Sequence, residues 1–217
     1  MSDSEDDGGS GDEWITICDE KNIVLKKNDT NTYKIVFNIN LKNKEDTVLN
    51  VLKNGQLFDL LSALNPDVIS KVNVVESEED GIQYIFMTFE NGKMNQNESK
   101  DKNKTQHNYT NASDENDKII HVFFCLKYIF KENKCIVRSQ KFNYHDKEEL
   151  ASKIAALKKG KEFLSIGKIK LKAVECNNKT SISLMFKVDG KKSSNIVNMY
   201  IGLYFKKMFY RFKQYFE

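Results

Sequence analysis

The residues best suited to nucleophilic, acid–base or metal chemistry are three histidines and four cysteines, and their spacing predicts none of these. His107, His121 and His145 lie far apart and belong to no nucleophile, metal or acid–base motif. Asp146 follows His145 directly, but it is better explained as the N-cap of a helix. No CxxC pair and no Cys–His pair at metal-ligand spacing occurs among Cys18, Cys125, Cys135 and Cys176. We expect reduced thiols and no metal.

The ten glycines lack the GxGxxG and P-loop spacings that cradle nucleotides. The sequence therefore predicts no cofactor and a protein that is not an enzyme. An acid-based site assembled from distant residues stays open as an alternative.

Charge is divided unevenly along the chain. The first twenty residues hold eight acids and no base, whereas residues 21–217 carry 34 bases and 23 acids, a net charge of +11. Opposed segments of this kind favour binding over catalysis. Ser2, Ser4 and Ser10 each precede an acid by three residues, as acid-directed kinases prefer, and are candidate phosphorylation sites. A purely solubilising tail is the alternative.

Trp14, the one tryptophan, stands where the acidic segment meets the body of the chain. With acids before it and Ile17 three residues after it, this segment resembles the short motif that docks on the ubiquitin-like modifiers of autophagy. The resemblance implies that Trp14 and Ile17 bind a partner as part of an extended peptide added to a sheet edge. The alternative is that the segment is the first strand of the protein's own fold.

Residues 194–217 predict a long amphipathic helix whose wide apolar stripe faces the core. The opposite face mixes tyrosines with bases, a composition typical of interface hot spots. It supplies the candidate partner-binding residues Tyr200, Leu203, Lys207, Tyr210 and Arg211. A groove that buries the helix on both sides is the alternative.

A lysine-rich surface is expected on two paired strands that precede this helix. Lys168, Lys170 and Lys172 alternate along the first of them and therefore share one face. The full set of anion-binding candidates is Lys168, Lys170, Lys172, Lys187, Lys191 and Lys192. No aromatic residue interleaves the lysines on the strand, so specific readout of bases is not expected. A solvated outer sheet face is the alternative.

The elements that must position these candidates form one predicted α+β domain. Alternating apolar residues predict the main strands, which span 33–41, 81–89, 119–130, 135–142, 168–173 and 182–188, besides short runs at 14–18 and 23–25. Leucines at helical spacing predict one short helix before residue 65, and Asn65-Pro66-Asp67 predicts the start of a second. Asp146 and Gly160 mark the ends of a further helix.

The predicted fold is thus a mostly antiparallel sheet of about seven or eight strands with a helical pair, one further internal helix and a long C-terminal amphipathic helix. Strands closed by such a helix loosely resemble the pleckstrin-homology architecture, although the internal helices depart from it. Residues 1–12 predict a disordered acidic tail, and residues 13–217 predict one domain, interrupted by a disordered Asn/Lys-rich insert at 91–118.

No secretory signal and no long apolar segment is visible, which predicts a cytoplasmic or nuclear location. The charge division and the aromatic helix together predict an adaptor or complex subunit that binds protein partners, with the acidic tail as a second contact. Peripheral binding to an anionic membrane or nucleic acid through the lysines is the alternative. No small-molecule substrate is inferred.

Overall fold

The computed structural model describes residues 13–43, 45, 47–77, 81–90, 119–141, 148–164, 166–188 and 195–217. The predicted tail at 1–12 and the predicted insert at 91–118 lie outside these residues. The described part confirms the α+β class, with four helices and one large, almost wholly antiparallel sheet.

The sheet is built from two antiparallel meanders joined by a hairpin. The first meander contains β1 (Ile15–Glu20), β2 (Ile23–Lys27) and β3 (Thr32–Asn40). The second contains β4 (Ile69–Glu76), β5 (Ile82–Glu90), β6 (Ile119–Lys131) and β7 (Lys134–Ser139). The hairpin of β9 (Ile166–Cys176) and β10 (Lys179–Val188) pairs with β7 on one side and β3 on the other. The strand order is therefore β1-β2-β3-β10-β9-β7-β6-β5-β4, and β8 (Phe163–Leu164) pairs in parallel with β6.

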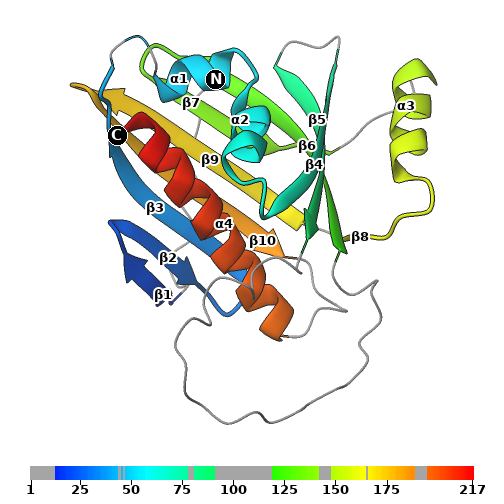
Figure 1. The fold of residues 1–217 in the computed structure, drawn as a ribbon, viewed down its shortest axis with the longest axis horizontal. Coiled ribbons are helices and arrows are strands. Elements are labelled where there is room, and N and C mark those ends of the chain that lie inside the picture. Colours follow the sequence, from blue (N-terminus) through cyan, green and yellow to red (C-terminus); the bar gives the residue numbers. More distant parts are fainter. Residues whose placement is uncertain are drawn as a thin grey trace.

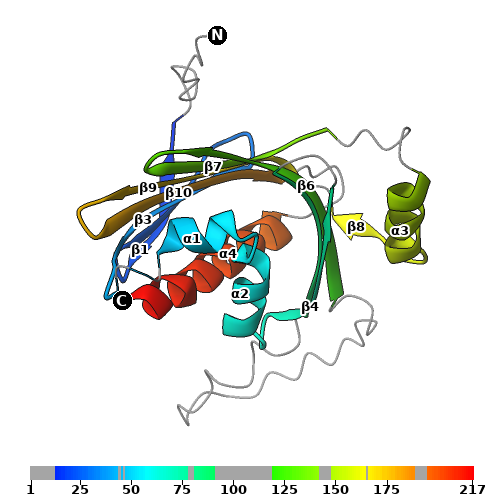
Figure 2. The ribbon, with the colours of Figure 1, turned by 90° about the horizontal axis from the view of Figure 1, so that it is seen from above.

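The four helices lie on two sides of this sheet. α1 (Val48–Lys53), α2 (Leu57–Leu64) and the long C-terminal α4 (Asn195–Phe216) lie within its concave side, around which the strands curve (Figures 1 and 2). α3 (Glu148–Lys158) lies outside, beside β8. Register shifts in the β9–β10, β1–β2 and β4–β5 pairs contribute to the curvature, because bulges increase local twist.

Alternation along the strands separates a core face from an outer face. In β3, Tyr33, Ile35, Phe37 and Ile39 are all buried on the concave side, as their period-two spacing predicts. α4 contributes Phe205, Met208, Phe209, Phe212 and Phe216 to the same core. A smaller cluster lies on the outer face, where Ile154 of α3 packs near Tyr84, Phe86 and Cys125.

The sequence prediction was wrong about the segment after Pro66. The second short helix expected there does not form, and β4 follows instead, because Ile69, Val72, Val74 and Val75 are β-branched residues that suit a strand. The helical pair lies earlier, as α1 and α2. The described residues form ten strands, more than the expected seven or eight.

Two turn predictions are confirmed. The β9–β10 hairpin turns at Asn177 and Asn178, both with positive φ, and Gly160, two residues after the end of α3, has φ +71°. The expected N-cap Asp146 lies outside the described residues.

Candidate ligand cavity

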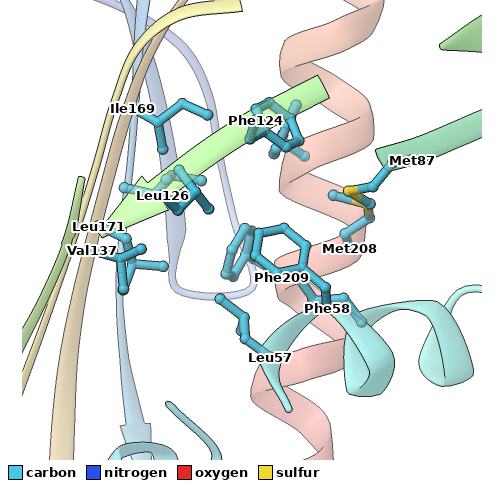
Figure 3. A pocket seen from close by; sticks show the side chains of 13 residues that line it. Leu57, Phe58, Met87, Phe124, Leu126, Val137, Ile169, Leu171, Met208 and Phe209 are labelled. Carbon is cyan, nitrogen blue, oxygen red and sulfur yellow. The ribbon is translucent and has the colours of Figure 1, made fainter. Parts of the chain in front are cut away.

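An apolar cavity lies between the concave face of the sheet and the helices α2 and α4 (Figure 3). Its volume is about 30 Å³. No polar side chain lines it: the lining residues are Leu57, Phe58, Leu61, Met87, Phe124, Leu126, Val137, Ile169, Leu171, Leu184, Phe205, Met208 and Phe209. An interior of this composition can bind apolar surface but offers no charge or hydrogen bond at its centre.

Aromatic side chains occupy much of the space that the curved sheet encloses. Phe209 of α4 points from the helix toward the strands, where Leu126 and Val137 face it (Figure 3). The rings of Phe186 and Phe205 lie 4.4 Å apart, and those of Phe58 and Phe124 lie 6.3 Å apart. These contacts join α4 and α2 to the concave face of the sheet and leave the small void between them.

One ionic contact ties the middle of α4 to the turn after α2. Asp67 accepts hydrogen bonds from the Arg211 guanidinium on both carboxylate oxygens, and Lys207 Nζ lies 2.9 Å from Asp67 Oδ2. Arg211 Nη1 also donates to the carbonyl oxygen of Leu64, the last residue of α2, at 3.3 Å. The Arg211 guanidinium, helped by Lys207, holds the pKa of Asp67 well below its usual range.

Further polar contacts hold α4 to the edge of the first meander. Lys206 Nζ lies 2.6 Å from Cys18 Sγ and 3.1 Å from Glu20 Oε2, both on β1. Near the end of the helix, Lys213 Nζ donates to the carbonyl oxygen of Asn38 on β3 at 2.8 Å. A backbone bond from Lys42 N–H to the carbonyl oxygen of Phe216 adds a further contact at the end of α4. α4 is therefore held at discrete points, whereas the strands are joined by continuous backbone ladders.

Three buried side-chain atoms in the described interior have no hydrogen-bond partner: Tyr33 Oη, Gln83 Oε1 and Tyr128 Oη. Burial raises the pKa of Tyr33 to about 12 and raises that of Tyr128 further still. Because an unpaired buried polar group costs free energy, such atoms are candidates for ligand contacts. No local sequence pattern indicates them, because hydrogen-bond pairing depends on neighbours that are remote along the chain.

The predicted partner-binding face of α4 is largely used within the protein. Leu203 and Tyr210 are half-buried and pack against the core, whereas Lys207 and Arg211 bond to Asp67. The side chain of Tyr200 lies outside the described residues. The alternative that both sides of the helix lie in a groove describes these contacts better than an open docking face does.

The predicted partner-binding pair Trp14 and Ile17 lies at the edge of the protein's own sheet. Ile17 falls at the β1 bulge and packs against the core, and Trp14 is half-buried with its ring 5.9 Å from Lys34 Nζ. Cys18, at the same bulge, is the site that sequence reasoning missed as a contact for α4.

The structure brings together only part of the predicted lysine set. Lys168, Lys170 and Lys172 lie on the outer face of β9, and Lys187 lies on the same face of β10. Lys191 and Lys192, like Ser2, Ser4 and Ser10, lie outside the described residues. These lysines are on the opposite side of the sheet from the cavity, so the cavity and the lysine face are separate features.

Side chains with catalytic potential do not converge in the described part of the chain. His121 Nδ1 lies 3.0 Å from Thr88 Oγ1, and burial lowers the pKa of this imidazole. Among the described residues, no group of three or more His, Cys, Asp or Glu side chains could hold a metal. The four cysteines, all within the described residues, form no disulfide bond. No described helix is long and apolar enough to span a membrane.

Comparison of the structure with solved structures identifies the architecture. It is similar to the human StarD13 (DLC2) lipid transfer and protein localization domain, with a TM-score of 0.59, 12% identity, and coverage of 95% of this chain and 90% of that chain. It is also similar to human StAR-related lipid transfer protein 5 (TM-score 0.58, 8% identity, 94% and 86% covered). A STAR-related lipid transfer protein from Xanthomonas axonopodis gives a TM-score of 0.53 at 12% identity, with 94% and 98% covered. No family model and no curated protein matches the sequence.

These similarities correct the functional prediction. An adaptor or complex subunit acting through α4 was the wrong interpretation, because the structures that share the fold are named for lipid transfer and the outer face of α4 is engaged internally. The alternative of binding membrane or nucleic acid through the lysines, and the inference of no small-molecule ligand, are set aside for the same reason. The fold is likewise not of the pleckstrin-homology type. The expectation of a non-enzymatic protein agrees with the names of these structures.

Proposed function

We propose that the protein binds an apolar, lipid-like molecule between the concave face of the sheet and helices α2 and α4. The observation that carries this proposal is the cavity, which lies at the centre of a fold similar to lipid transfer domains and is lined by apolar residues alone. Burial of apolar ligand surface there is favourable by about 25 cal/mol per Å². The apolar lining supports the proposed ligand class, and the similarity to lipid transfer domains supports the proposed carrier role.

Binding requires the cavity to enlarge. A volume of about 30 Å³ is close to the space of a single water molecule, whereas sites for small organic ligands occupy about 300–1,000 Å³. α4 is the element best placed to move, because it supplies Phe205, Met208 and Phe209 to the lining and is held at discrete points. Outward movement of α4 would expose the interior without breaking any strand pairing.

We place this activity in the cytoplasm or nucleus. The four cysteines form no disulfide bond with one another, which supports a reducing compartment, in which thiols persist.

The test is uptake of a pyrene-labelled phospholipid from vesicles by the purified full-length chain, measured after the protein is separated from the vesicles. We expect labelled protein at a ratio approaching one lipid per chain. Leu57→Trp would fill the cavity and should reduce uptake about tenfold or more. Leu60→Trp is the matched control, since Leu60 is a half-buried residue of the same helix that does not line the cavity. Folded wild-type protein that takes up no lipid would refute the proposal.

A further inference from the structure

The concave interior has a polar end, formed by Gln83 of β5 and Tyr128 of β6. Both side chains are 7% exposed or less, and Gln83 Oε1 and Tyr128 Oη lack hydrogen-bond partners. An unpaired buried polar atom loses its water without replacement, at a cost of about 1–3 kcal/mol. Two such atoms in the same part of the interior suggest that a ligand group pairs with them.

The two side chains are neighbours on the same face of the sheet. Gln83 is paired with Leu126, and Tyr128 lies two residues farther along β6. Residues in this diagonal relation have their Cβ atoms about 7–8 Å apart or somewhat less, within reach of one small group placed between the side chains. Tyr128 belongs to the main core, and Gln83 Nε2 donates to the carbonyl oxygen of Gly55 in the α1–α2 turn at 3.4 Å, so both face the concave side.

This pair adjoins the cavity lining. Leu126, the partner of Gln83, lines the cavity, and so does Val137, the partner of Tyr128 in the β6–β7 ladder. The α1–α2 turn closes this end: Gly55 has φ +69°, and a Cβ there would lie 2.4 Å from Gln83 Nε2. Gln83 and Tyr128 therefore lie beside the apolar cavity and under this turn, next to lining residues, although they do not line the cavity themselves.

We propose that Gln83 and Tyr128 recognise a hydroxyl group at the end of a neutral lipid. The ligand hydroxyl would donate to Gln83 Oε1 and accept from Tyr128 Oη, which satisfies both unpaired atoms at once. An anionic ligand end is disfavoured, because no described cation lines the cavity and burial of an unpaired charge is costly. This inference rests on the proposed function and specifies its ligand class.

The test compares three pyrene-labelled chains of equal length that end in a hydroxyl, a methyl or a carboxylate group. Wild-type protein should bind the alcohol about tenfold more tightly than the alkane, the equivalent of one well-formed hydrogen bond, and the carboxylate more weakly than the alcohol at neutral pH. Tyr128→Phe and Gln83→Met should remove most of this preference, so that the alcohol and the alkane bind with similar affinity. Tyr33→Phe is the matched control: Tyr33 also has an unpaired hydroxyl, but three strands separate β3 from β6 in the sheet.

A second measurement does not depend on ligand. Tyr128→Phe should raise the thermal unfolding midpoint of the empty protein, because it removes an unpaired buried hydroxyl. If the hydroxyl instead served to stabilise the fold, the same change would lower the midpoint. Equal binding of alcohol and alkane by the wild type, or a preference that survives in both variants, would overturn the inference and leave the proposed function standing. Binding of none of the three chains would instead refute the proposed function, and this inference with it.

Discussion

Arg211 of α4 forms a bidentate ion pair with Asp67, which follows Pro66 after the end of α2. The same guanidinium also donates a hydrogen bond to the carbonyl oxygen of Leu64, the last residue of α2. The guanidinium thus donates hydrogen bonds both to a carbonyl group at the end of a helix and to a carboxylate. Since α2 and α4 both line the cavity, this pair joins the two helices that would have to separate under the proposed function. It is the contact most directly placed to control opening.

Asp67→Asn should weaken this connection. The carboxylate is 37% exposed, so solvent screens the pair and we expect a loss of only about 1 kcal/mol in the free energy of unfolding. Lipid uptake should become faster, by several fold, because α4 is released more often. Chemical denaturation and the uptake rate provide the two measurements. Glu149→Gln is the control, as it removes an ion pair on α3, far from the cavity; equal acceleration in both variants would contradict the assignment.

The same pair predicts a pH dependence. Hydrogen bonding to Arg211 and Lys207 holds the pKa of Asp67 below its ordinary value of 3.8. A carboxylate with a depressed folded pKa adds stability that is complete above the unfolded pKa and is lost as pH falls through the folded pKa. The difference in unfolding free energy between wild type and Asp67→Asn should therefore be constant from about pH 5 to pH 8 and shrink below about pH 4. A difference that stays constant in acid would argue against the pair.

Gly202 of α4 should resist replacement. In most helices Gly→Ala stabilises by about 1 kcal/mol. Here a Cβ at Gly202 would lie 2.9 Å from two ring atoms of Tyr33, so α4 would be pushed from the sheet. We expect Gly202→Ala to destabilise by about 1–3 kcal/mol, as overpacking does. In a Tyr33→Leu background the same change should become neutral or stabilising, and denaturation of the four proteins measures this reversal.

Much of the fold could be predicted from the sequence, because local patterns determine it. Period-two alternation at Tyr33, Ile35 and Phe37 indicates both the strand and its buried face, and Asn177-Asn178 indicates the hairpin turn. The segment after Pro66 was misassigned because Asn65-Pro66-Asp67 has the composition of a helix start. Instead, Asn65 caps α2 through its side-chain bond to Leu61, and Asp67 pairs with α4.

The site could not be predicted in this way. Leu126, Val137 and Leu171 are ordinary core residues in the sequence, and only the curvature of the sheet makes them the wall of a cavity. The tyrosines and bases of α4 suggested a partner-binding face because their partners within the protein are not visible in the sequence. Arg211 meets Asp67 across 144 residues, and such a contact turns an apparent docking face into an internal one.

Phe209→Ala should convert the small void into a usable cavity. Phe209 is 3% exposed and lines the cavity from α4, so its loss should cost about 3–5 kcal/mol of unfolding free energy. Apolar cavities made this way stay dry and bind small aromatic molecules, so benzene should raise the thermal midpoint of this variant and not that of wild type. Tyr215→Ala is the control on the same helix, since Tyr215 is 54% exposed and its replacement should change stability little and create no benzene site. A benzene response equal in the two variants would mean that Phe209 does not fill the interior.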